Sequence, residues 1–479
     1  MGVADLKFTG VRTYGWSRST SAMGQIARPR NIEEIREVLE NAEAKDLCIA
    51  NRNAGRSYGD ATLIDSEIIL DTSLMNRILN WNPESGVIEV EPGVTIEQVL
   101  LRTAGDGWVF PVMPGTRFVS MAGALSNNVH GKNAYHQGYV GEHVLSCMVL
   151  LANGDHVCCG SGQNEELFHC IISGMGFIGV FTKITLQLRR VPSFYIHGKV
   201  RKFRSFGELI DSYDEIKKSY EYSIAWIDSL KPGAELGRGE LHFGNFRNDQ
   251  DFRITQHDVP KRLGGIVPHR TVAVAARVSM NRHTMRLVND IQMRTSNMSA
   301  DVDGEKISLS QYHYLMDMKF PHYNRFFRHG FFLYQPIVPF DRATAVYLRL
   351  MKMTLDYGFP SYMTGLKAYR SQRVPFLTTF ELDGFSLTMD IPKVPMRIRE
   401  QTEMFYRMND IVIQNGGRIY LGKTSVATKE HLYAMYPRVN EFLRCKNKYD
   451  GTHRFQSNMY RRILRLPGKN GEIPSNWEY

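Results

Sequence analysis

Residues 114–141 read PGTRFVSMAGALSNNVHGKNAYHQGYVG, and this stretch decides the fold expected for the chain. It alternates polar residues, among them His130 and Lys132, with residues that have little or no side chain. The small residues are Gly115, Ser120, Ala122, Gly123, Ala124, Gly131 and Gly138. Small residues let backbone N–H groups approach a flat, polar ligand closely. A glycine-rich surface loop has a similar composition, so the stretch alone leaves both interpretations open.

The composition limits the classes of protein to consider. The chain has 479 residues, which is more than a single hydrophobic core usually supports, so two domains are expected. The net charge of +10 favours an anionic partner, either a phosphorylated substrate or an anionic lipid surface. No nucleic-acid-reading motif is visible, so nucleic acid is not expected as a partner.

No apolar run approaches the roughly 20 residues that span a bilayer, and residues 1–10 lack the apolar segment of a signal peptide. We therefore expect a cytoplasmic protein, and the net charge of +10 makes peripheral docking on the inner face of the membrane a further hypothesis. No stretch forms a clear amphipathic anchor for that docking.

The six cysteines are Cys48, Cys147, Cys158, Cys159, Cys170 and Cys445. They show no paired spacing and several lie in apolar runs, so we expect reduced, buried thiols. His130, Glu142 and His143 lie close in sequence, but no HExxH or Cys/His spacing accompanies them, so no metal is expected.

Periodicity and turn residues predict an α+β fold. The first part predicts a helix over 31–44 capped by Asn31, a turn-rich loop over 51–61, and a helix over 95–104. Strands are expected over 47–50, 68–70, 87–90, 144–151 and 156–158, the last two as a hairpin. A helix over 165–172 and a strand over 180–188 enclose Gly174, Gly176 and Gly179. These glycines spell GxGxxG, but a dinucleotide fingerprint follows a strand and opens a helix, so we assign them no Rossmann role.

From about residue 197 the composition becomes richer in aromatic and charged residues. Strands are expected over 223–228, 330–339, 385–391 and 418–421, and helices over 342–357, 398–415 and 429–444. We divide the chain into an α+β unit over 1–196, a separate sheet-and-helix domain over 197–412, and a segment over 413–479 that returns to the first unit.

Several motifs together resemble the vanillyl-alcohol-oxidase type of FAD-linked oxidoreductase, with its two-subdomain PCMH-type FAD-binding domain. They are GRSYGD (55–60), EPGVTIEQVL (91–100), PGTR (114–117), NNVHGKN (127–133) and GMGFIGV (174–180). YSIAWID (222–228), FLYQPIVP (332–339), GGRIYLGK (416–423) and MYPRVNEF (435–442) extend the resemblance over nearly the whole chain. Within this superfamily the chain is most similar to the decaprenylphosphoryl-ribose 2′-oxidase family.

The resemblance implies that the unit over 1–196 is the FAD-binding domain, to which 413–479 returns, and that 197–412 is the substrate-binding (cap) domain. FAD is then held between two α+β subdomains by two backbone segments. The implied contacts in the first segment are Asn51, Arg52, Asn53, Ala54, Gly55, Arg56, Ser57, Tyr58, Gly59, Asp60 and Ala61. Those in the second are Gly115, Ser120, Met121, Ala122, Gly123, Asn127, Asn128, Val129 and His130, and Val180 and Tyr420 complete the set. Arg56 stands where several relatives carry a histidine that links the flavin covalently, so we expect non-covalent FAD.

The resemblance also implies the reacting residues. Lys423 matches an essential active-site lysine, a cation that would stabilise anionic reduced flavin, and His130 and Tyr58 complete the catalytic set. Lys132, Gln335, Lys367, Tyr369, Thr388 and Lys423 match substrate-pocket positions. Thr388 stands where relatives have a cysteine, and Ser386 replaces their asparagine, which leaves the exact polyprenyl sugar open.

The activity implied is oxidation of the 2-hydroxyl of a polyprenyl-phosphoryl ribose by hydride transfer to flavin, in cell-wall arabinan precursor synthesis. A short-chain reductase partner and an anionic membrane surface are implied with it. The alternatives are an aldonolactone or alditol oxidase that uses oxygen, and a flavin-free basic binding protein with the same fold.

Overall fold

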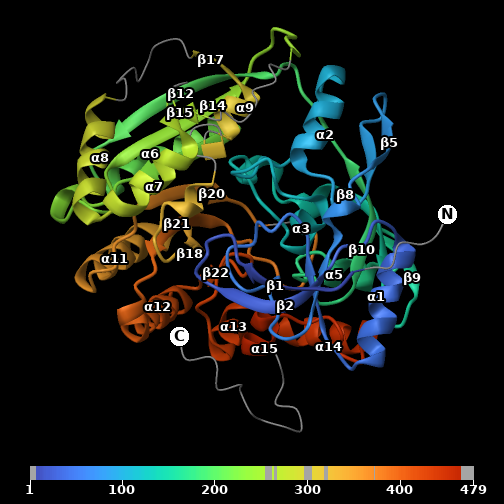
Figure 1. Cartoon of the computed structure of the whole chain (residues 1–479). Helices are drawn as coiled ribbons and strands as arrows, with labels where there is room; N and C mark the ends of the chain where they lie inside the picture. The colour runs from blue at the N-terminus through green and yellow to red at the C-terminus, as the bar shows by residue number, and fades with distance from the viewer. Residues whose placement is uncertain are drawn as a thin grey trace.

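A computed structural model describes residues 7–253, 262–263, 267–295, 305–314, 316–317, 322–371 and 373–464. Two small sheets and one large sheet organise these residues, and helices cover them (Figure 1). The fold is therefore α+β, as the sequence predicts. Among the described residues no helix is both long and apolar enough to cross a membrane.

The first small sheet has the strand order β1-β2-β4-β3. Its strands are β1 (Thr9–Tyr14), β2 (Ser21–Ala27), β3 (Ile49–Arg52) and β4 (Ile68–Asp71). Helix α1 (Ile32–Ala44) packs its apolar stripe, Ile35, Val38 and Leu39, into the core with this sheet. The Asn31 side chain accepts a hydrogen bond from the Glu34 N–H, which confirms the predicted cap.

The second small sheet has the order β5-β6-β10-β8-β9. Its strands are β5 (Ile78–Asn82), β6 (Val87–Val90), β8 (Val144–Leu150), β9 (His156–Gly160) and β10 (Val180–Gln187), and β8 and β9 form the predicted hairpin. The helices of this part are α2 (Ile96–Thr103), α3 (Met121–Ser126), α4 (Ala134–Gln137) and α5 (Glu165–Ile171). Because α5 precedes the GxGxxG sequence and β10 follows it, the geometry is not that of a Rossmann turn.

The large sheet has the order β17-β12-β14-β13-β20-β21-β19-β22, and β18 pairs with β21. Its strands are β12 (Tyr195–Phe203), β13 (Tyr222–Ile227), β14 (Gly239–Phe246), β17 (Glu305–Ser308), β18 (Phe331–Tyr334), β19 (Pro336–Pro339), β20 (Met363–Tyr369), β21 (Gly384–Pro392) and β22 (Arg418–Ile419). Helices α6 (Phe206–Ser219), α11 (Ala343–Asp356) and α12 (Ile398–Gln414) pack against it in a row. Helix α8 (Arg282–Thr295) follows α7 (His269–Ser279) and lies beside the ends of β12, β13 and β14 (Figure 1). Shorter elements are β7 (Trp108–Val109), β11 (Arg189–Arg190), β15 (Arg262–Leu263), β16 (Val267–Pro268) and α9 (Leu309–His313).

The C-terminal helices lie beside the N-terminal strands (Figure 1). They are α13 (Lys429–Met435), α14 (Val439–Tyr449) and α15 (Asn458–Ile463). Buried Lys446 of α14 donates hydrogen bonds to the carbonyl oxygens of Phe177 and Phe455, at 2.6 and 2.7 Å, and pairs with Asp450. The domain boundaries at residues 196 and 412 stay a prediction.

Three expectations from the sequence are wrong. The helix expected over 429–444 is two helices, because Pro437 has no N–H to donate and clashes with the preceding turn. The strand expected over 330–339 is split into β18 and β19, with Gln335 between them. Cys170 of α5 and Cys445 of α14 form a disulfide where these helices pack together, so the expectation of reduced thiols fails for this pair.

Candidate active site

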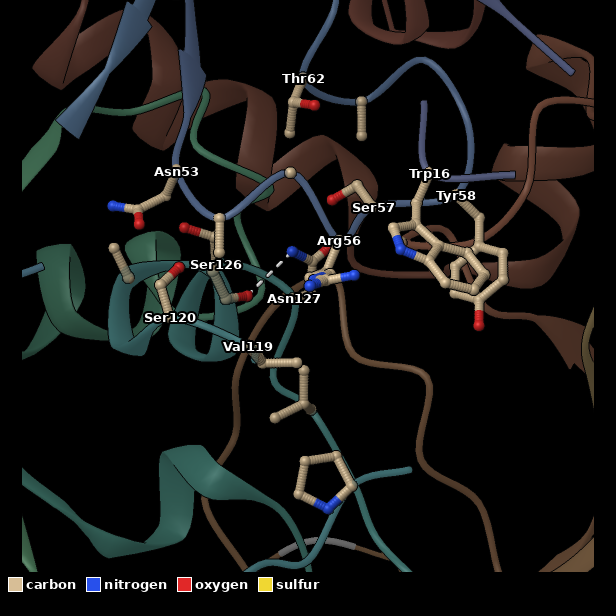
Figure 2. A pocket seen from close by; sticks show the side chains of 18 of the residues that line it. Trp16, Asn53, Arg56, Ser57, Tyr58, Thr62, Val119, Ser120, Ser126 and Asn127 are labelled. Carbon is tan, nitrogen blue, oxygen red and sulfur yellow. Dashed lines mark hydrogen bonds between the residues drawn. The ribbon is translucent and has the colours of Figure 1, made fainter. Parts of the chain in front are cut away.

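A cavity lies where the loop over 51–61, the segment over 114–130 and the YLGK sequence meet (Figure 2). Its lining contains most of the cofactor and substrate positions expected from the sequence. These are Asn51, Arg52, Asn53, Ala54, Gly55, Arg56, Ser57, Tyr58, Ala61, Gly115, Ser120, Ala122, Gly123, Asn127, Val129, His130, Val180, Lys367, Tyr420 and Lys423. Three distant parts of the chain therefore converge on one cavity.

Other expected positions lie behind the lining. They are Gly59, Asp60, Met121, Asn128, Lys132, Gln335, Tyr369 and Thr388. Asp60 forms a buried ion pair with Arg462, at 3.0 Å, and Met121 belongs to the hydrophobic core. The Thr388 hydroxyl donates to the Gly365 carbonyl. The side chains of Asp60, Met121 and Thr388 therefore support the loops and the sheet around the cavity.

Sequence reasoning missed several lining residues. They are Trp16, Thr62, Thr72, Pro114, Thr116, Val119, Ser126, Met175, Gly176, Gly179, Phe181, Met316, Asp317, Tyr323 and Gly422. The Asn51 side-chain amide donates to the carbonyls of Gly176 and Gly179, at 2.7 and 3.2 Å. The GxGxxG sequence thus serves the cavity by fixing the first loop, although it is no Rossmann motif. Trp16 and Tyr323 had no local signal, because only tertiary folding brings them here.

Several lining side chains carry buried polar atoms without a hydrogen-bond partner. Among them are Asn53 Oδ1, Arg56 Nε, Asn127 Oδ1 and His130 Nδ1. An unpaired buried polar group costs on the order of 1–3 kcal/mol, so such atoms concentrate where a ligand supplies the partner. At Gly115 an added Cβ would meet no atom within 4 Å, so the backbone faces open space there. The cavity therefore combines hydrogen-bond donors, hydrogen-bond acceptors and backbone that no side chain covers. This combination fits a dinucleotide.

His130 is a neutral imidazole in the cavity wall. Burial, with Lys367 and Lys423 nearby, holds its pKa well below the usual value. The Gln335 amide nitrogen lies 3.0 Å from His130 Nε2 and donates to it, which assigns the ring proton to Nδ1. The ring also stacks on Phe380, with centroids 5.5 Å apart. His130 therefore offers one fixed N–H donor to a cavity ligand.

Lys367 and Lys423 line one end of the cavity, Lys132 lies beside them, and all three lysines are half-buried. Burial lowers the pKa of Lys423 to about 7, of Lys132 to about 7 and of Lys367 to about 8, and the positive charge of Lys367 further lowers the first two. Among the described residues no carboxylate raises the pKa of Lys132 or Lys367. The Lys132 ammonium donates to the Tyr312 carbonyl, at 2.5 Å. This end of the cavity therefore has an excess of cationic groups.

Lys423 has one acidic neighbour, Asp390 of β21. Burial raises the pKa of Asp390 to about 7, and its carboxyl bonds the Tyr323 hydroxyl. Tyr323 and Tyr58 place their hydroxyl oxygens 3.2 Å apart, and the Lys423 Nζ lies 5.3 Å from the centre of the Tyr58 ring. The side chains of Asp390, Tyr323 and Tyr58 thus form a hydrogen-bonded chain beside the Lys423 amine.

A buried carboxyl also supports the turn before His130. Asn128 has a left-handed backbone, with φ of 42°, and its side-chain amide donates to Glu381 at 2.5 Å. Burial raises the pKa of Glu381 to about 8. The side-chain Oδ1 of Asn128 accepts a hydrogen bond from the Gly141 N–H at 2.9 Å. Asn128 and Glu381 therefore position the His130 segment from behind.

The alternative metal interpretation has no geometric support. Glu142 pairs with Arg370 at 2.8 Å, and His143 Nε2 bonds the Gln137 carbonyl at 2.8 Å. Across the described ranges no group of three or more His, Cys, Asp or Glu side chains is placed to hold a metal ion.

Comparisons with known proteins agree with this geometry. The family model described as FAD binding domain matches residues 24–160, and the model described as D-arabinono-1,4-lactone oxidase matches residues 389–463. Decaprenylphosphoryl-beta-D-ribose oxidase of Mycolicibacterium smegmatis is 26% identical over 97% of this chain and 100% of its own length. D-arabinono-1,4-lactone oxidase of Yarrowia lipolytica is 26% identical over 44% of this chain and 39% of its own length. L-gulonolactone oxidase of Bos taurus is 25% identical over 44% of this chain and 49% of its own length.

The fold, the cavity and these matches define an FAD-dependent oxidoreductase, and FAD is its cofactor. Within that class the chain is similar along nearly its whole length to the decaprenylphosphoryl-ribose oxidase, whereas its similarity to the two lactone oxidases covers less than half of the chain.

Proposed function

We propose that this enzyme oxidises a secondary hydroxyl of an anionic sugar, the 2-hydroxyl of a polyprenyl-phosphoryl pentose. The proposal rests on a group of three half-buried lysines: Lys367 and Lys423 line one end of the flavin cavity, and Lys132 lies beside them. Asp390 is the one acidic neighbour of this group, so the group carries excess positive charge that an anionic ligand stabilises. A neutral lactone leaves that charge uncompensated, whereas a sugar phosphate offsets it.

The three lysines have two different roles, substrate binding and proton transfer. Lys132 and Lys367 orient the phosphorylated sugar, and Gln335 and Tyr369 position the residues around it. Because the pKa of Lys423 is about 7, part of the population is a neutral amine at neutral pH and accepts the proton of the substrate hydroxyl. The Tyr58–Tyr323–Asp390 chain lies beside this amine, and the Asp390 carboxylate stabilises the protonated form of Lys423.

FAD held by the 51–61 and 114–130 segments would supply the hydride acceptor that oxidation of the alcohol to a ketone requires. Protonated Lys423 then offsets the negative charge that arises beside it, and the neutral His130 donates its Nδ1–H to the ligand. Arg56 stands in the cavity wall at the position of the linking histidine of relatives, so the proposal has the cofactor bound without a covalent link.

The resulting keto sugar requires a reductase to complete an epimerisation, so we include a short-chain reductase among the partners. The proposed setting is the cytoplasmic face of the membrane, where a lipid-linked substrate resides. The supporting observations are the net charge of +10 and the full-length similarity to an oxidase whose name specifies a decaprenylphosphoryl sugar.

A second function is an aldonolactone oxidase that uses oxygen. The match of residues 389–463 to the D-arabinono-1,4-lactone oxidase model favours it. This function uses the same flavin cavity but gives no role to the cations at Lys132 and Lys367.

Product analysis tests the two functions against each other. The enzyme is incubated with polyprenyl-phosphoryl ribose and an artificial acceptor, and separately with D-arabinono-1,4-lactone in air. We expect a 2-keto polyprenyl-phosphoryl sugar from the first incubation and no hydrogen peroxide from the second. Peroxide with the lactone and no keto product from the phosphorylated sugar would select the lactone oxidase.

A further inference from the structure

Helices α7 and α8 present apolar side chains to solvent. On α7, Val274 and Val278 are 65% and 85% exposed. On α8, Leu287, Val288 and Ile291 are also exposed. Residues four apart lie on the same face of a helix, so Val274 and Val278 form one stripe and Leu287 and Ile291 another. Five of these large apolar side chains lie within one helical hairpin, which is more than scattered surface residues explain.

The same hairpin is strongly cationic. Residues 269–295 contain five arginines and one aspartate. The aspartate, Asp290, is already engaged by Arg238 and by Lys231, the latter at 3.2 Å. Arg277, Arg282 and Arg294 are exposed. Arg277 follows Val274 by three residues and Arg294 follows Leu287 by seven, so a cation flanks each apolar stripe.

A shallow hollow beside α7 adds further positive charge. Its lining consists of Arg18, Arg277, Arg325 and Phe327. Within the described part of the chain none of these three arginines forms an ion pair with a carboxylate. The Arg277 guanidinium donates to the Arg328 carbonyl at 3.2 Å, which holds it at the hollow. Three guanidinium groups around one hollow match the geometry of a phosphate ester.

We propose that the face formed by the α7–α8 hairpin and the three-arginine hollow binds the surface of an anionic lipid bilayer. Val274, Val278, Leu287 and Ile291 enter the boundary between headgroups and acyl chains. Arg18, Arg277 and Arg325 bind lipid phosphates, and Arg282 and Arg294 add long-range attraction. A bilayer is the occupant that combines an apolar layer with a plane of negative charge, which is the pattern this face complements.

The hairpin also adjoins the cavity. Met280, in the turn between α7 and α8, packs with Trp16, Tyr58 and Tyr323 in one cluster. These three aromatic residues line the flavin cavity. In the part of the inference that rests on the proposed function, docking at this face brings the cavity wall to the membrane that holds the lipid tail of the substrate.

Vesicle co-sedimentation of the flavin-loaded enzyme tests the docking. One set of vesicles is pure phosphatidylcholine, and the other contains equal parts of phosphatidylcholine and phosphatidylglycerol. The variants are Val278→Asp with Leu287→Asp, and separately Arg277→Glu with Arg325→Glu. Met396→Asp is the matched control, because Met396 is 98% exposed on a different element. Gel filtration of all variants reports any change in oligomeric state.

We expect the parent enzyme and the Met396→Asp control to bind the anionic vesicles and not the neutral ones. Each double variant should bind at least about tenfold more weakly, because one removes two apolar side chains from the bilayer boundary and the other replaces two cations by anions. Equal binding by the parent and both double variants would overturn the inference. The inference would also be overturned if the parent enzyme did not bind anionic vesicles. A parent enzyme that is a dimer, with a monomeric Val278→Asp, Leu287→Asp variant, would likewise overturn it.

Flavin reduction in detergent, measured in parallel, separates this inference from the proposed function. If the double variants lose vesicle binding but reduce normally with a solubilised phosphorylated sugar, both conclusions stand. If the parent binds vesicles and the sugar causes no reduction, the proposed function fails alone. If reduction is normal and vesicle binding is absent, only the docking face is wrong.

Discussion

The Lys423 amine is the side chain on which the proposed chemistry most depends. Its burial, its lowered pKa and its position over the Tyr58 ring place a titrating amine in the cavity wall. Asp390 opposes the lowering of that pKa, and Lys367 reinforces it. The protonation state of the amine is therefore set by a few neighbours that can be altered one at a time.

Replacing Lys423 by methionine should preserve FAD binding and slow flavin reduction by the phosphorylated sugar at least about a hundredfold. The reason is that a positioned acid–base group contributes about 10²–10⁴-fold to a proton-transfer step. Stopped-flow absorbance under anaerobic conditions measures the rate, and the protein-bound absorbance spectrum measures FAD content. Lys352→Met, at an exposed lysine of α11, is the control and should reduce at the parent rate. Reduction of the Lys423→Met variant at the parent rate would remove this residue from the mechanism.

Affinity for a phosphorylated pentose should fall as the pH rises through the range of the lysine pKa values. Lys132 and Lys367, with pKa values of about 7 and about 8, are ammonium groups below that range and neutral amines above it. Their attraction for a phosphate is therefore present at the lower pH and lost at the higher pH. Titration of the flavin absorbance gives the dissociation constant at each pH.

The Lys367→Met variant provides the check on this pH dependence. It should bind about tenfold more weakly at low pH, in line with the loss of one charged hydrogen bond, and its affinity should change less with pH. An unchanged pH profile in this variant would show that Lys367 does not contact the phosphate.

At the scale of elements, the buried Lys446–Asp450 pair holds α14 to the flavin-binding part. Lys446 is fully buried and donates to carbonyls of two other segments. We predict that Lys446→Ala lowers the free energy of unfolding by about 3–5 kcal/mol, because it leaves the Asp450 carboxylate buried and unpaired. Lys448→Ala, at an exposed lysine of the same helix paired with Glu166, should cost about 0–1 kcal/mol. Urea unfolding of the two variants side by side measures the difference, and equal costs would contradict this role.

Local signals in the sequence predict those elements whose cause is local. Helix α1 was predictable because Asn31 caps it and its apolar residues recur with a period of 3.6 residues. The β8–β9 hairpin was predictable because a turn separates two apolar runs. Pro437 was a visible helix breaker within the expected helix over 429–444. The split at Gln335 had no such signal, since it depends on how β18 and β19 share β21. The solvent-facing hairpin of α7 and α8 was also missed, because exposure depends on what the rest of the chain leaves uncovered.

The site shows the same division between local and tertiary causes. Small residues indicated the cradle, but not all of them serve the ligand. An added Cβ at Gly131 would lie 2.3 Å from the Met113 backbone, so that glycine is needed for chain packing. Lys423 and His130 carry motif signals in the sequence. Trp16 and Tyr323 line the cavity through contacts between residues more than 300 positions apart, which no local pattern encodes.

At the scale of the whole molecule, three distant segments must assemble before the cofactor site exists. Because Arg56 stands at the expected position of a linking histidine, we expect FAD to be held by these segments without a covalent bond. It should then leave the protein when the fold is lost. Acid precipitation should release the yellow chromophore into the supernatant, where chromatography identifies it as FAD. Thermal unfolding should shift to higher temperature with added FAD, because a ligand that binds only the folded state stabilises it. Flavin that stays with the pelleted protein would contradict the non-covalent assignment.

We infer that the flavin cavity binds an anionic sugar in preference to a neutral one, and anaerobic bleaching of the bound flavin tests this preference. Polyprenyl-phosphoryl ribose and D-arabinono-1,4-lactone are mixed separately with the oxidised enzyme without oxygen. We predict loss of the flavin absorbance with the phosphorylated sugar and little or no change with the lactone. Faster bleaching by the neutral lactone would show that the cavity does not prefer an anionic sugar.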